Sequence, residues 1–167
     1  MKAGNLYIYV DESGSPDVFS RKGGDLLAAG LTSNHLVIAA LRCDDPNQLA
    51  SCIGASIQWA DAKYGSGVGK TPVRVLHARD DRPALRVRVC QELSKLPLKA
   101  TAIVFDKRLL DPAREWRRNR TRFYDEMVAY LLADSLHLFQ RTSIIISRKN
   151  YDTAAELQTL LRAAARR

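Results

Sequence analysis

The sequence predicts an α/β fold in which helices pack on a mixed β-sheet. Residues 6–10 alternate aliphatic and aromatic side chains, two acids follow at 11 and 12, and the chain then breaks into the turn residues 13–16, which is the pattern of a strand and its end. Residues 100–106 form a short apolar run of the length of a buried strand. Further along the chain, helical and strand patterns alternate. A series of strands followed by alternating helices and strands indicates a mixed sheet with helices packed on it.

The first third of the chain predicts a three-stranded antiparallel meander. After the strand at 6–12, residues 17–25 form a polar hairpin connection, and the apolar runs 26–31 and 36–41 form the second and third strands. The run 36–41 has an alternative, because alanine and leucine are good helix formers and this segment is also compatible with the start of a helix.

The rest of the chain predicts helices and strands in turn. Asp45 and Pro46 open a helix that continues to about residue 63, and the glycines at 65, 67 and 69 end it. The elements expected after it are a strand at 73–77, a helix at 82–96, a strand at 100–106, a helix at 121–139, a strand at 143–147 and a helix at 152–162 that Asp152 caps.

Length and composition favour one globular domain over residues 1–167, with 46% hydrophobic and 26% charged residues. The apolar runs are too short to cross a membrane and the N-terminus carries no secretory pattern, so we expect a cytoplasmic protein without a membrane partner. The three cysteines do not form a disulfide framework, and we expect buried, reduced thiols. A net charge of +8 favours a polyanionic partner such as nucleic acid.

Asp11 and Glu12 are adjacent carboxylates at the end of the first strand. Successive side chains of a strand point to opposite faces, so Asp11 shares a face with Tyr7 and Tyr9, while Glu12 points the other way. A carboxylate at a strand end suits a hard divalent cation such as Mg²⁺. The alternative is that both acids are solvated at a strand edge.

A basic segment follows the strand that ends at Asp106. Its cationic residues are Lys107, Arg108, Arg114, Arg117, Arg118, Arg120 and Arg122, with Trp116, Phe123 and Tyr124 interleaved. Such clusters bind phosphate backbones, and exposed aromatic rings stack on bases. A solvated loop and helix start is the alternative. The position next to Asp106 favours neighbouring cation and phosphate sites.

His77 ends the short strand at 73–77 beside acids and arginines, where a histidine can orient phosphate, transfer protons or bind metal. We expect His35 and His137 to be structural. Residues 65–71 end in Gly-Lys-Thr but do not form a phosphate-binding loop, because Tyr64 stands where the first glycine is required.

Four motifs together resemble a known family. They are Tyr9-Val10-Asp11-Glu12-Ser13-Gly14, Leu76-His77-Ala78, Val104-Phe105-Asp106-Lys107 and Phe123-Tyr124. From the first strand to about Arg148, the chain resembles the bacterial and phage family called domain of unknown function 3800. The resemblance implies a ribonuclease-H-like fold and a nuclease dependent on Mg²⁺ or Mn²⁺. It further implies that Asp11 binds the metal, that Asp106 is the second carboxylate, and that Glu12 and His77 lie near the site.

The chain departs from that family at its C-terminal end. Members often carry an aspartate where this chain has Ser147, and they usually continue into a further strand and helix, so we expect a C-terminally shortened domain. Losing metal ligands threatens catalysis more than binding. Asp134, Asp152 or a second subunit are alternative sources of the missing oxygen.

The sequence therefore predicts a metal-dependent phosphodiesterase acting on nucleic acid. Asp11 and Asp106 hold the metal, His77 assists, and the arginines at 114–122 hold the backbone. The alternative is a nucleic-acid-binding or regulatory module that keeps the fold without the chemistry. Its open sheet edge would then be covered by a protein partner or a second copy in a homodimer. DNA and RNA are equally compatible with these patterns.

Overall fold

The structure is a computed structural model that describes residues 3–20, 22–64, 76, 81–109, 119–136, 139–147 and 154–164. The chain divides into two compact units. One consists of residues 1–42 and 100–167, and the other of residues 43–99. The expectation of one domain over the whole length stays a prediction.

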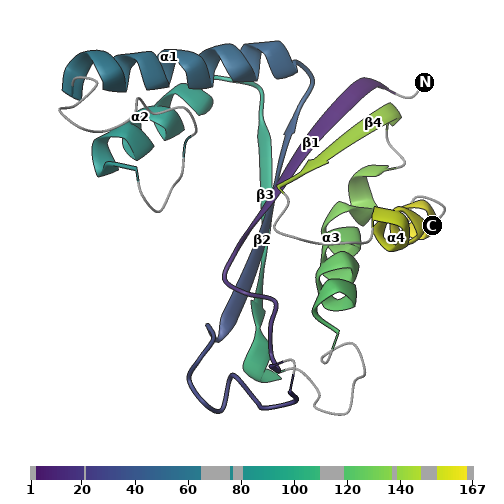
Figure 1. Cartoon of the computed structure of the whole chain (residues 1–167). Coiled ribbons are helices and arrows are strands. Elements are labelled where there is room, and N and C mark those ends of the chain that lie inside the picture. Colours follow the sequence, from purple (N-terminus) through teal and green to yellow (C-terminus); the bar gives the residue numbers. More distant parts are fainter. Residues whose placement is uncertain are drawn as a thin grey trace. The chain divides into compact units, whose positions relative to one another are not determined.

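The first unit contains a four-stranded sheet in the order β3-β2-β1-β4. The strands are β1 (Ala3–Ser13), β2 (His35–Cys43), β3 (Lys99–Asp106) and β4 (Phe139–Ile146). β4 runs parallel to β1, with Ile8 opposite Ile144. β1, β2 and β3 run in alternating directions, so the sheet is mixed (Figure 1). The end of β1 therefore lies beside the start of β2 and near the end of β3.

An antiparallel meander is present, but its third strand is β3, and residues 26–31 are not part of it. Residues 26–30 form turns, and only an isolated bridge joins Phe19 to Asp25. The Asp25 carboxylate accepts hydrogen bonds from the backbone N–H groups of Leu27 and Ala28, at 2.9 and 3.0 Å. An aspartate that binds its own following backbone stabilises a turn over a strand. Of the two alternatives for residues 36–41, the strand is correct.

The core of this unit lies between one face of the sheet and helix α3 (Arg120–Leu136), which contacts α4 (Ala154–Ala164). The buried residues of this core are Leu6, Ile8, Val10, Leu36, Ile38, Ala40, Phe123, Tyr124, Val128, Leu131 and Leu132. The contributions of β1 are all even-numbered. Its odd-numbered residues, including Tyr9 and Asp11, therefore point to the opposite face.

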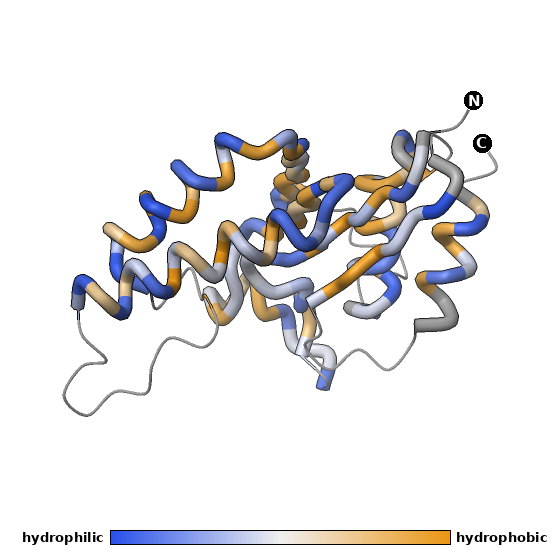
Figure 2. The backbone as a smooth tube through the Cα atoms, turned by 90° about the horizontal axis from the view of Figure 1, so that it is seen from above, coloured by the Kyte–Doolittle hydropathy of each residue, from blue (hydrophilic) through white to orange (hydrophobic). Residues whose placement is uncertain are grey.

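The second unit is a helical hairpin of α1 (Pro46–Tyr64) and α2 (Pro83–Leu93). Both helices alternate between hydrophilic and hydrophobic residues along their length (Figure 2), as expected for helices with one buried face. The Asp45 carboxylate caps α1 by accepting hydrogen bonds from the N–H groups of Asn47 and Gln48. Trp59 and Tyr64 pack edge to face, with ring centroids 5.9 Å apart.

Helix ends differ from the sequence expectation by a few residues. α3 ends at Leu136 rather than at residue 139, because β4 begins at Phe139 and pairs with β1 from there on. α2 ends at Leu93, three residues before the predicted end. Of the strand expected at 73–77, only residue 76 is described, and it has no regular secondary structure. The cap expected at Asp152 falls outside the described residues.

The cysteines are free thiols, but they are not all buried. Cys43 is buried, Cys52 is half-buried and Cys90 is exposed. Cys90 lies on the exposed side of α2. The helical pattern in the sequence does not determine which face of this helix is buried. Across the described helices, none combines the length and the apolar character that crossing a membrane requires.

Candidate functional site

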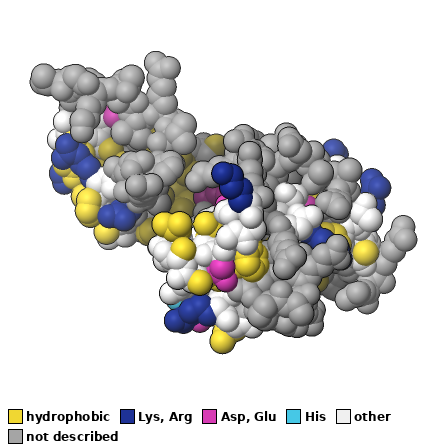
Figure 3. Space-filling model, turned by 60° about the horizontal axis from the view of Figure 1, so that its bottom comes forward, with side chains coloured by type: hydrophobic (Ala, Val, Ile, Leu, Met, Phe, Trp, Pro, Cys, Tyr) yellow, Lys and Arg dark blue, Asp and Glu magenta, His cyan; other side chains and the backbone are white. Residues whose placement is uncertain are grey.

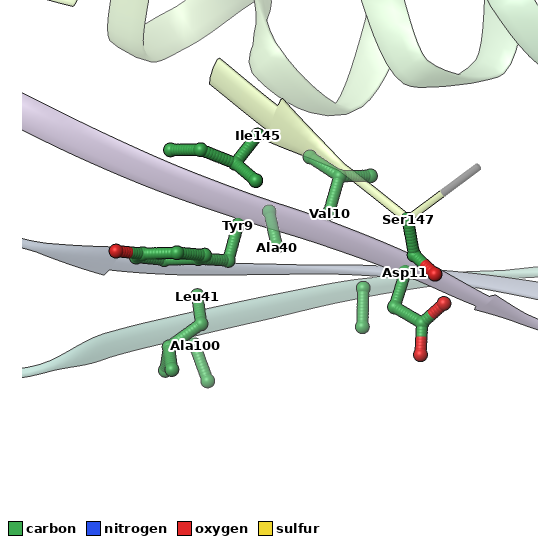
Figure 4. A pocket seen from close by; sticks show the side chains of 9 residues that line it. Tyr9, Val10, Asp11, Ala40, Leu41, Ala100, Ile145 and Ser147 are labelled. Atoms are coloured by element: carbon green, nitrogen blue, oxygen red, sulfur yellow. The ribbon is translucent and has the colours of Figure 1, made fainter. Parts of the chain in front are cut away.

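Asp11 and Ser147 lie side by side where β1 and β4 end. The register places Val10 opposite Ile146, and the Ser147 N–H donates a hydrogen bond of 3.0 Å to the Val10 carbonyl oxygen. In a parallel pair this puts the next residue of each strand, Asp11 and Ser147, on the same face of the sheet. Figure 4 shows the Asp11 carboxylate and the Ser147 hydroxyl next to one another. Both side chains are exposed.

These two residues form the polar end of a pocket of about 330 Å³. The remaining lining is apolar or aromatic and comes from all four strands: Tyr9, Val10, Ala39, Ala40, Leu41, Ala100 and Ile145. Every lining residue belongs to the first unit. The pocket therefore lies on the sheet face opposite α3, with its carboxylate and hydroxyl oxygens at one end (Figure 4).

Glu12 lies on the other face of β1, as strand geometry predicts. The Tyr124 hydroxyl of α3 donates a hydrogen bond of 3.1 Å to Glu12 Oε2. Tyr124 is 2% exposed and belongs to the core. Glu12 is thus connected to the packing of α3 against the sheet, while Asp11 faces the pocket.

Asp106, at the end of β3, is held by Arg108. Arg108 Nε donates to Asp106 Oδ1 at 2.9 Å, and Nη2 donates to Oδ2 at 2.6 Å. The Arg108 backbone N–H donates to Oδ1 at 3.0 Å. These hydrogen bonds, the arginine charge and the charge of His35, whose Nε2 lies 3.9 Å from Oδ2, lower the pKa of Asp106 to about 2. Figure 3 shows histidine, basic and acidic side chains gathered at this edge.

Lys107 is completely buried, at 0% exposure. Its Nζ donates hydrogen bonds to the carbonyl oxygens of Ser15 and Asp17 and to Thr32 Oγ1, at 2.9, 3.1 and 3.0 Å. Burial lowers the pKa of this lysine. The ammonium group therefore joins η1 (Lys107–Leu109) to the loop after β1 and is not presented to a phosphate on the surface.

The basic segment is described only in part. Arg122 is half-exposed, and its Nε donates to Glu126 Oε1 at 3.1 Å one helical turn later. Asn119 caps α3 by accepting the Arg122 N–H with its Oδ1 at 3.1 Å. Arg120 begins α3, and its side chain is not described. The other predicted residues that fall outside the described ranges are His77, Arg114, Arg117 and Arg118.

The described residues fit a single divalent cation better than a pair. In the described part of the chain, no three histidine, cysteine or acidic side chains form a metal-binding group. Asp106 is engaged by Arg108, and Asp134 is exposed on α3. Mg²⁺ is commonly bound by one or two carboxylates together with substrate phosphates. Asp11 with the adjacent Ser147 hydroxyl meets that smaller requirement.

His35, which was expected from the sequence to be structural, lies on the surface beside Asp106, with a half-exposed side chain. No spacing in the sequence connects residues 35 and 106. The connection arises because β2 and β3 are antiparallel neighbours, so the start of one meets the end of the other. A sequence prediction that paired β2 with β3, instead of with residues 26–31, would have brought His35 and Asp106 together.

No protein-family model and no curated protein matches this chain. Among solved structures, it is similar to a chain of the PCNA:RNase HII complex from Archaeoglobus fulgidus, with a TM-score of 0.53 and 13% sequence identity. The match covers 96% of this chain and 58% of the other chain, so this chain spans less than two thirds of the length of the chain that it matches. The predicted fold class is confirmed: the chain has a ribonuclease-H-like fold with a mixed sheet.

Proposed function

We propose that the protein acts on nucleic acid and hydrolyses a phosphodiester bond with the help of Mg²⁺ or Mn²⁺ held at Asp11. The observation that carries this proposal is the position of Asp11, an exposed carboxylate at the end of β1 in a ribonuclease-H-like sheet, at the polar end of a pocket. The similar solved structure contains a nuclease, RNase HII. The net charge of +8 suits a polyanionic substrate.

The Asp11 carboxylate and the Ser147 hydroxyl would hold the cation. A bound divalent cation lowers the pKa of water and stabilises negative charge on a phosphate. Arg122, with Arg114, Arg117, Arg118 and Arg120, binds the sugar-phosphate backbone through its charge. His77 assists proton transfer. Membership of the family called domain of unknown function 3800 is part of the same proposal and rests on the motifs around Asp11 and Asp106.

The test compares two neighbouring carboxylates that face opposite sides of β1. Purified protein is incubated with labelled single- and double-stranded DNA and RNA, with Mn²⁺ or with a chelator. We expect Asp11→Asn to lower the cleavage rate at least 100-fold, since it removes the group that holds the cation. Glu12→Gln, which keeps the shape and the contact to Tyr124, should stay within about threefold of the wild type. Cleavage that persists in Asp11→Asn would remove Asp11 from the mechanism.

A second candidate is a nucleic-acid-binding module without turnover. Two observations favour it. The residue beside Asp11 on the neighbouring strand end is Ser147 rather than a second carboxylate, and the Asp106 carboxylate is hydrogen-bonded to Arg108. This candidate predicts salt-sensitive binding of nucleic acid and no cleavage with any divalent cation. On single strands, the logarithm of the binding constant should fall with the logarithm of the salt concentration by about 0.7 per phosphate contacted.

A further inference from the structure

We propose that the pocket beside Asp11 binds the base of an unpaired nucleotide, so that the substrate is single-stranded nucleic acid. The inference rests on the proposed function, because it places the phosphate of the same nucleotide at Asp11.

The lining matches the chemistry of a nucleotide. Tyr9 contributes an aromatic ring, and Leu41, Ala100 and Ile145 contribute aliphatic surface. The oxygens of Asp11 and Ser147 lie at one end (Figure 4). A base has two apolar faces, and its sugar and phosphate extend from one side. Base stacking on aromatic side chains tolerates any base, because each has a π-face.

The size and the exposure of the pocket are compatible with a ligand site. The volume of about 330 Å³ lies at the lower end of the range of small-ligand pockets, which bind with mostly apolar walls and a few polar groups. Ile145 on β4 is 43% exposed, so a large apolar side chain of the wall remains in contact with water. Ala39 on β2 and Ala100 on β3, which also line the pocket, are exposed as well, and contiguous apolar surface of this kind marks binding sites.

The spacing along β1 connects this pocket to the proposed cation. Tyr9 and Asp11 are two residues apart on the same face, and a strand rises about 3.3 Å per residue, so their Cα atoms are separated by about 6.6 Å. A base packed against Tyr9 therefore leaves its own phosphate within reach of a cation at Asp11. In a duplex the faces of each base are covered by its neighbours, so only an unpaired or extruded base can enter.

The experiment measures how much the base contributes to binding. A fluorescein-labelled single-stranded DNA 12-mer and an abasic 12-mer of equal length are titrated with protein in chelator, and anisotropy gives both dissociation constants. We expect the wild type to bind the normal strand about tenfold more tightly. Tyr9→Phe should keep this ratio and Tyr9→Leu should lower it to about one. Tyr7→Leu, on the same face of β1 but outside the pocket, is the matched control and should keep the ratio.

Equal affinity of the wild type for both strands would overturn the inference, as would an unchanged ratio in Tyr9→Leu that retains its circular dichroism spectrum. Cleavage with Mn²⁺ is measured in parallel to separate the two proposals. A base preference without cleavage supports the pocket and overturns the nuclease. Cleavage that depends on Asp11 without a base preference supports the nuclease and overturns the pocket.

Discussion

Gly14 fixes the turn that directly follows Asp11 and Glu12. Its φ of +90° lies in the region that favours glycine, and a Cβ atom there would come within 2.5 Å of the His35 carbonyl oxygen. The end of β1 can therefore approach the start of β2 only because residue 14 has no side chain. This close approach sets the direction in which the chain leaves the candidate site.

Gly14→Ala is expected to destabilise the protein by about 2–4 kcal/mol, because it combines an unfavourable φ with a backbone clash. Gly23→Ala is the matched control, since Gly23 has a φ of +85° and a Cβ atom there would meet no described atom within 4 Å. It should cost only about 1–2 kcal/mol. Urea denaturation of both variants measures the difference. Equal losses would show that the contact with His35 relaxes freely.

Asp106 titrates below the usual range because of Arg108, and this has a direct consequence for the pH dependence of stability. The folded pKa of about 2 lies below the ordinary value of 3.8, so the pair contributes stability above about pH 4 and loses it as the pH falls towards 2. Arg108→Met should raise the pKa of Asp106 towards 3.8. Its effect on stability should be present at pH 5 and vanish near pH 2.

Carbon-detected NMR titration of the Asp106 carboxyl measures that pKa directly. Lys95→Met is the control, because it removes the ion pair of Lys95 with Glu92 in the second unit and leaves Asp106 untouched. A pKa of Asp106 that stays near 2 in Arg108→Met would mean that His35 or the backbone, rather than the guanidinium, dominates the shift.

At the scale of elements, local hydrophobic patterns predicted the strands that bury one of their two faces. The alternation in β1 identified both the strand and the separate faces of Asp11 and Glu12. Residues 26–31 are equally apolar, but the Asp25 carboxylate and Gly30, with its φ of +66°, stabilise turns there. These are local contacts that hydrophobic patterning does not contain, so the middle strand of the predicted meander was wrong.

Lys107 was predicted to contact nucleic acid, and nothing in its sequence context revealed that it is buried. Its ammonium connects η1 with two positions of the loop after β1 and with Thr32. Lys107→Met keeps the aliphatic stem and leaves these acceptors without the charged donor. We expect a loss of about 2–4 kcal/mol and faster amide hydrogen exchange at residues 15–18.

Two controls delimit this effect. Thr32→Val removes one of the three acceptors and should cost about 1 kcal/mol, while Lys95→Met on the surface should change stability by less than about 0.5 kcal/mol. Urea denaturation gives all three values. A Lys107→Met variant as stable as the wild type would show that desolvation of the ammonium cancels its hydrogen bonds.

At the scale of the whole molecule, the sheet order decides which predicted residues meet. Asp11 was predicted from its strand end. Ser147 stands where members of the family called domain of unknown function 3800 often carry an aspartate, and the resemblance to that family stays a prediction. The register now puts Asp11 and Ser147 side by side. Asp106 lies on β3, two strands from β1, with a strand spacing of about 4.8 Å. This separation does not follow from local sequence, because it depends on pairing between distant segments, whereas Arg108, which binds the Asp106 carboxylate, lies only two residues further along the chain.

Ser147→Asp therefore tests whether the site at Asp11 is half of a metal centre. A second carboxylate beside Asp11 adds an anionic oxygen ligand, and we expect Mn²⁺ to bind about tenfold more tightly, as measured by isothermal titration calorimetry. Ser143→Asp is the matched control: it adds the same charge to β4, but its partner in the register is Tyr7, so affinity should change less than about threefold. If both variants gain equally, the added charge acts at long range rather than as a ligand. If only Ser147→Asp gains affinity, and adding Asp11→Asn abolishes the gain, the cation binds at the end of β1. The cleavage rate of Ser147→Asp, which then has two adjacent carboxylates, would measure how far one missing oxygen ligand limits the chemistry.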